Sequence, residues 1–106
     1  MISALLDIAT INVIAESELS RATAGMGADQ SAAYRRLVRV IRQAWMVTSE
    51  RSEDGLERLR ARVQQARSDA RAAGVDAWAI HGAIDVARTI ERRQRQAMAR
   101  AREEVR

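Results

Sequence analysis

The chain has 106 residues, enough for one ordinary domain. It has no Cys, no Pro and one His, which excludes a disulfide scaffold, a Cys-ligated metal site, a Cys nucleophile and a Pro-rich linker protein, and argues against a multi-histidine metal site. The formal net charge is +4, and all 18 basic residues are Arg. We therefore predict a non-enzymatic protein with no catalytic, cofactor-binding or metal-binding residues and no cofactor.

The apolar residues favour a small helical fold with a thin core. They make up 47% of the chain, but 21 of them are Ala and only 22 are Leu, Ile or Val. The share of Leu, Ile, Val and Phe in the chain is therefore close to the level of about 20% below which a chain tends to be disordered. No segment alternates apolar and polar residues with the period of a strand. The sequence predicts one all-α domain over 1–106, a small four-helix bundle with an antiparallel C-terminal helical hairpin.

Glycines and helix-capping residues divide the chain into its helices. Gly25 and Gly27 interrupt the first apolar stretch, and a polar stretch at 48–55 makes a second break. At the third break, Gly74 is placed to end one helix and Asp76 to begin the next. The predicted helices cover about 2–23, 30–50, 55–73 and 77–104.

The first helix has an unusually wide apolar face. Its polar residues Ser3, Asp7, Thr10 and Ser17 form one narrow strip, so most of its surface needs cover from the other helices or from a second copy. This predicts a homo-oligomer. No basic residue precedes Arg21, and the apolar run is shorter than the roughly 20 residues of a membrane span. We therefore expect a cytoplasmic protein without membrane contact.

The second helix has one apolar and one basic side. No acidic residue lies between Asp29 and Glu50, so the basic side carries arginines alone, with Met46 among them. Such a side can bind along a phosphate backbone or contact an acidic protein. A GC-rich genome also encodes Arg in place of Lys at ordinary exposed positions, so the choice of Arg has a second explanation. The apolar side consists of Tyr34, Leu37, Val38, Ile41, Ala44, Trp45 and Thr48, and the arginines are Arg35, Arg36, Arg39 and Arg42.

Along the apolar stripes of the last two helices, which we call their seams, large apolar residues give way to Ala toward the C-terminal end. The third helix runs from Leu56 and Leu59 to Ala66 and Ala70 along its seam. The fourth has little large apolar surface beyond Ile90, so we expect its end to project into solvent or to pair with a second subunit. It also carries a second basic strip, formed by Arg88, Arg92 and Arg95, in a run that Glu91, Glu103 and Glu104 partly neutralise.

Two further features have competing interpretations. His81 and Asp85 lie four residues apart, as in a pair that orients a general base. Because nothing in the sequence indicates a nucleophile or an oxyanion site, we favour a surface pair. For Trp78 we favour core packing over an exposed anchor for a partner.

These patterns predict an oligomeric helical protein that binds nucleic acid through an Arg-rich helix face. The alternative is a protein-interaction module, such as an assembly subunit, adaptor or inhibitor of a larger machine of the kind encoded by phages and mobile elements. The residues expected to contact the nucleic acid or the protein partner are Arg35, Arg36, Arg39, Arg42, Met46, Arg88, Arg92 and Arg95.

Overall fold

The computed structural model describes residues 2–47 and 53–104, and within them the chain is all-α with no strand. The predicted fold class is confirmed, and the helix bounds agree to within a few residues. The predicted end of the second helix lies outside the described residues. The four helices are α1 (Ile2–Ala22), α2 (Ala28–Val47), α3 (Glu53–Ala72) and α4 (Ala77–Glu104).

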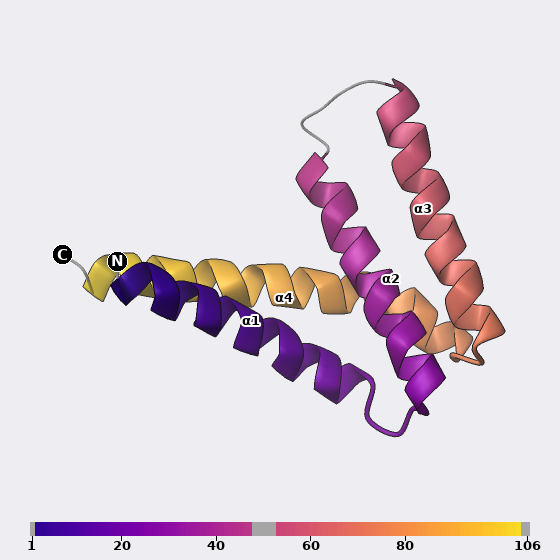
Figure 1. Ribbon diagram of the computed structural model, residues 1–106, viewed down its shortest axis with the longest axis horizontal. Helices are drawn as coiled ribbons and strands as arrows, with labels where there is room; N and C mark the ends of the chain where they lie inside the picture. Colours follow the sequence, from indigo (N-terminus) through magenta and orange to yellow (C-terminus); the bar gives the residue numbers. More distant parts are fainter. Residues whose placement is uncertain (1, 48–52, 105–106) are drawn as a thin grey trace.

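The long helix α4 is shared by the other helices (Figure 1). Its C-terminal half lies antiparallel to α1, so the start of α1 and the end of α4 are neighbours at one end of the molecule. Its N-terminal half is crossed by α2, and α3 lies beside α2. The turn between α3 and α4 is tight, as expected of a helical hairpin, but contact between these two helices is limited and α3 packs mainly on α2.

The core lies where α2, α3 and α4 meet. Leu37, Val38 and Ile90 are almost completely buried, as the predicted apolar stripes require. Small side chains at Ala70 and Ala83 let the helix axes approach closely. The buried residues of this core are Tyr34, Leu37, Val38, Val40, Ile41, Ala66, Ala70, Val75, Ile80, Ala83, Ala87 and Ile90.

The predicted break between the last two helices has the geometry of a helix stop followed by a helix start. Gly74 has a φ of +91°, and the Val75 N–H donates to the Ala70 carbonyl at 3.0 Å, as in a Schellman turn. Asp76 Oδ1 then accepts a hydrogen bond from the Trp78 N–H at 3.2 Å, which caps α4. Gln30 Nε2 donates to the Gly74 carbonyl at 3.2 Å and so ties this turn to the start of α2.

The C-terminal half of α4 neither projects alone into solvent nor needs a second subunit to find a helix partner. It packs against α1 of the same chain. Buried Gln94 marks this contact, since its Nε2 donates to the Ile11 carbonyl at 2.9 Å. Further along α4, Ala97 and Ala101 are half-buried, and small residues at such positions allow a neighbouring helix to approach closely.

The preferred core position of Trp78 is wrong, because its side chain is 80% exposed. Ile80 and Ala83, which follow the Asp76 cap, face the core. Trp78 precedes Ile80 by two residues and therefore points to nearly the opposite side of the helix. Val75 and Ile80 fill this end of the core instead.

The molecule is open for its size. Its radius of gyration is 15.5 Å, against about 13 Å for a compact domain of this length. Its accessible surface is 7831 Å², roughly 1,900 Å² more than the size scaling for monomeric proteins gives. A typical interface covers about 800 Å² on each partner, so the excess is large enough for partner surfaces.

Two glycines provide a matched test of the turn. Gly74→Ala places a Cβ 3.0 Å from Gln30 Nε2 at a positive φ, and we expect it to lower the free energy of unfolding by about 1–2 kcal/mol. Gly82→Ala, inside α4 where a Cβ meets no described atom within 4 Å, should raise it by about 0.5–1 kcal/mol. Urea unfolding of the two variants measures both effects, and equal shifts would contradict this account of the turn.

Candidate nucleic-acid interface

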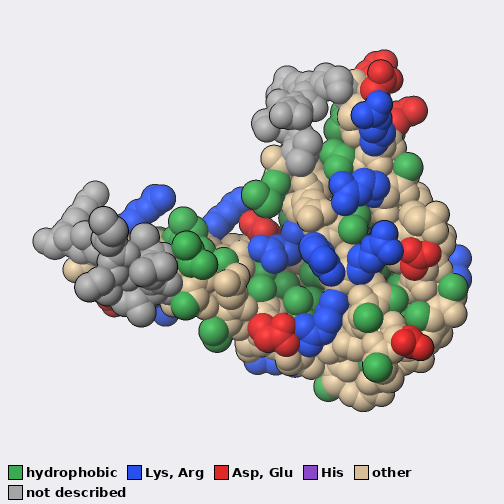
Figure 2. Space-filling view, in the orientation of Figure 1, with side chains coloured by type: hydrophobic (Ala, Val, Ile, Leu, Met, Phe, Trp, Pro, Cys, Tyr) green, Lys and Arg blue, Asp and Glu red, His purple; other side chains and the backbone are tan. Residues whose placement is uncertain are grey.

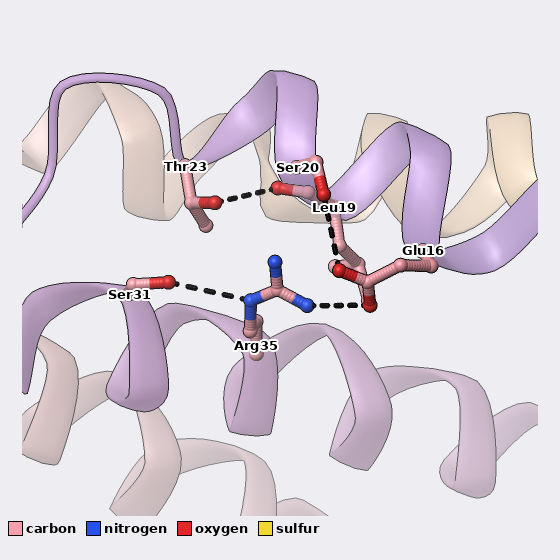
Figure 3. A network of polar contacts seen from close by, with 6 residues as sticks. All are labelled: Glu16, Leu19, Ser20, Thr23, Ser31 and Arg35. Carbon is pink, nitrogen blue, oxygen red and sulfur yellow. Dashed lines mark hydrogen bonds and ion pairs between the residues drawn. The ribbon is translucent and has the colours of Figure 1, made fainter. Parts of the chain in front are cut away.

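Arg35, the first arginine of the basic side of α2, is engaged by α1 (Figure 3). Its Nη1 lies 2.7 Å from Glu16 Oε2, and its Nε donates to Ser31 Oγ at 3.3 Å. Glu16 also accepts a hydrogen bond from Ser20 Oγ at 3.0 Å. The hydrogen bonds from Arg35 and Ser20 lower the pKa of Glu16, and the bond to Glu16 raises the pKa of Arg35. This network joins the C-terminal part of α1 to α2.

Arg42 connects α2 to α4 and, through it, to α1. Its Nε donates to Glu91 Oε1 at 3.0 Å and its Nη2 to Gln94 Oε1 at 2.8 Å. Gln94 in turn donates to the carbonyl of Ile11. Because Arg42 and Glu91 are both largely covered, we assign this arginine to holding three helices together.

A further arginine joins α4 to α1 at the junction where α1, α2 and α4 meet. Arg93 of α4 forms an ion pair with the carboxylate of Glu18 on α1, and Glu18 is buried. Arg35, Arg42 and Arg93 thus each bind an acid or amide that belongs to a different helix. We call them the structural arginines.

The remaining arginines of α2 are more accessible. Arg36 Nη1 lies 3.5 Å from Asp69 Oδ2 of α3, and both side chains are partly exposed. Arg39 is exposed and has no acidic partner within the described residues. The basic side of α2 is therefore not the uncompensated face that its own sequence suggests, because acids from α1, α3 and α4 reach it. Figure 2 shows acidic side chains among the arginines over α2 and α3.

The second basic strip retains its charge. Arg88, Arg92 and Arg95 are all exposed on one side of α4. Together with Trp45 and Met46, at the end of α2, they line an open groove of about 670 Å³, which Glu91 and Gln96 complete. We call this the basic groove. The structure thus brings four of the predicted contact residues into one surface.

The charges in the basic groove are almost all positive. Glu91, its one acidic lining residue among those described, is already bound by Arg42. Arg88 Nη1 lies 4.0 Å from Asp85 Oδ1, where both side chains are well exposed, so solvent screens this pair. Arg92 and Arg95 have no acidic partner in the part of the chain that the structure describes. The groove therefore offers guanidinium groups to an anionic ligand.

Trp45 is the groove residue that sequence reasoning missed as a contact. Its spacing placed it on the apolar side of α2, yet it is 37% exposed, because it lies beyond the core formed where α2 crosses α4. Met46 beside it is 75% exposed, which agrees with its predicted place on the basic side. Two large apolar residues in succession, Trp45 and Met46, cannot both face the core, so this pair near the end of α2 could have indicated an exposed contact in the sequence.

His81 and Asp85 lie on the surface of α4, and both are exposed. The carboxylate of Asp85 forms a long ion pair with Arg88, with 4.0 Å between Asp85 Oδ1 and Arg88 Nη1. No cluster of three or more potential metal ligands occurs among the residues described in 2–47 and 53–104. No described helix has an apolar stretch long enough to cross a membrane.

Comparisons with family models, curated proteins and solved structures found no match to this chain.

The Glu16–Arg35 pair predicts a specific response to acid. Because the folded pKa of Glu16 is lowered, its contribution to stability is present above the ordinary pKa near 4.5 and is lost as the pH falls through the folded value. We expect the stability of the wild-type protein to fall more steeply than that of Glu16→Gln below about pH 4.5. Urea unfolding across this range measures the difference. Exposed Glu57→Gln is the control, and a Glu16→Gln profile parallel to the wild type would contradict the prediction.

Proposed function

We propose that the protein is a non-enzymatic nucleic-acid-binding module that contacts phosphates through the basic groove. The observation that carries the proposal is the meeting of Arg88, Arg92 and Arg95 with Trp45 and Met46 in that groove. Guanidinium groups bind phosphate through paired hydrogen bonds, and contacts of this kind dominate binding without sequence preference.

The spacing of the three arginines supports contact with an extended strand. They follow one another at four and three residues along α4, so they span about 10 Å of one helix side. Trp45 adds an aromatic surface on which a base can stack, a contact worth roughly 1–3 kcal/mol in single-strand binding. Since bases are free to stack only where they are unpaired, single strands fit this groove better than duplexes.

The arginines of α2 divide into two roles under this proposal. Arg35 and Arg42 hold α2 against α1 and α4. Under this proposal they keep α2 in position beside α4 and do not themselves contact the nucleic acid. Arg36 and Arg39 are accessible and extend the positive surface along α2.

Self-association belongs to the same proposal. Ile8 and Val13 of α1 are 57% and 66% exposed, and Met98 of α4 is also exposed, so the pair of helices α1 and α4 keeps large apolar side chains uncovered. A second copy that covers some of these side chains would remove part of the excess accessible area. Repeated basic grooves in one particle would also strengthen binding to a long strand.

Loss of Arg92 and Arg95, for which the described residues provide no acidic partner, tests the nucleic-acid contact. We expect Arg92→Ala/Arg95→Ala to weaken binding of a labelled oligothymidylate by about ten-fold at low salt and to reduce the slope of log affinity against log salt by about 1.4. Fluorescence anisotropy across a salt series measures both quantities.

The matched control removes the same charge from α3. Arg58→Ala/Arg71→Ala changes two exposed arginines outside the basic groove, so it should retain the wild-type salt slope. Equal losses in the two double variants would mean that net charge alone attracts the strand. If the wild-type protein binds neither single-stranded nor duplex DNA at low salt, the proposal is wrong.

Light scattering tests self-association. We expect a mass above the 11.8 kDa of one chain, and a shift toward that mass in Val13→Glu, because a carboxylate would be buried in the interface. Ala32→Glu, at an exposed position of α2, should leave the mass unchanged. A wild-type mass of 11.8 kDa at high concentration would contradict the expectation.

A further inference from the structure

The largest apolar residues of the α3 seam are its least covered ones. Ala66 and Ala70 are buried against the rest of the bundle, whereas Val63, Leu59 and Leu56 are only partly buried. A seam normally buries its leucines first, since burial of a Leu side chain contributes about 1.5–3 kcal/mol. The exposed end of this seam therefore has apolar surface that the described residues do not cover.

These residues line a second groove, between α2 and α3. It has a volume of about 310 Å³ and meets the basic groove at Trp45, which lines both. A smaller hollow of about 230 Å³ extends it to Ile84 on α4. Along the core, α4 covers the α2–α3 pair with Ala83 and Ala87. We call the groove between α2 and α3 beyond these alanines, together with its smaller extension, the apolar groove. Its lining includes Trp45, Leu56, Leu59, Val63, Arg60 and Arg67.

The rim of the apolar groove is positive. Of the described residues that line it, none is acidic, while Arg60 and Arg67 border it and Arg88 borders its inner end. Arg67 Nε is buried and has no hydrogen-bond partner among the described residues. No lining residue among those described therefore neutralises the arginines of this rim.

We propose that the apolar groove binds an amphipathic helix of a partner protein, with apolar residues in the groove and carboxylates on its arginine rim. A helix in this position would take the place that α4 occupies further along the α2–α3 pair, and its acids would meet Arg60 and Arg67. A second copy placed groove to groove would set these arginines against their own equivalents. Charge complementarity therefore selects an acidic partner.

Designed peptides test this proposal directly. One synthetic helix carries Leu at positions i, i+4, i+7 and i+11 with Glu on both flanks, and its counterpart has Lys at every Glu position. We expect the acidic peptide to bind at least about ten-fold more tightly. In NMR spectra it should shift the indole N–H signal of Trp45, while the signal of Trp78, on the first turn of α4, stays in place.

Two variants separate the rim from the apolar floor. Arg60→Gln/Arg67→Gln should reduce the preference for the acidic peptide to about two-fold or less. Leu59→Ser should weaken both peptides while circular dichroism shows an intact helical fold. Neither change should alter oligothymidylate binding, because the residues lie outside the basic groove, so failure here and failure of the nucleic-acid proposal are distinguishable.

Three results would overturn the proposal. The first is the absence of a saturable Trp45 shift with acidic peptide up to about 1 mM. The second is equal affinity for the acidic and the basic peptide. The third is a fall in particle mass on Leu59→Ser in light scattering, which would make a second copy the occupant.

Discussion

The arrangement of the whole molecule depends on the sharing of α4 between two sets of helices. Its N-terminal half completes the core with α2 and α3, and its C-terminal half supports α1. The two halves meet at Gln94, which is buried and joins Arg42 of α2 to the backbone of α1 at Ile11. A buried amide of this kind is stable only when its partners are in place, so this contact specifies how the three helices cross.

That crossing sorts the arginines into two groups with different chemistry. Arginines that face the junction find carboxylates from other helices, as Arg35 does with Glu16 and Arg93 with Glu18. Those on the outer side of α4, such as Arg92 and Arg95, remain open to solvent. The net charge of +4 is therefore an incomplete guide to binding, since it is the position of each guanidinium that decides whether a phosphate can reach it.

Local features of the chain were predictable because their causes are local. The apolar period of α2 located Leu37 and Val38 in the core, and the turn at Gly74 follows from backbone conformation and capping alone. The candidate site was only partly predictable. Pairs such as Arg35 with Glu16 join positions 19 residues apart, and only the helix crossing brings them together. The exposure of Trp45 has the same origin, since periodicity shows which side of a helix is apolar but not where its neighbour ends.

We infer that helix packing leaves Arg88, Arg92 and Arg95 of α4, and not the structural arginines at the junction, available to an anionic strand. NMR signals of the individual arginine Nε–H groups test it most directly during titration with an oligothymidylate. The account predicts that the signals of Arg88, Arg92 and Arg95 shift, while those of Arg35 and Arg42 keep their positions. Shifts at Arg35 and Arg42 with unchanged signals from Arg88, Arg92 and Arg95 would contradict it.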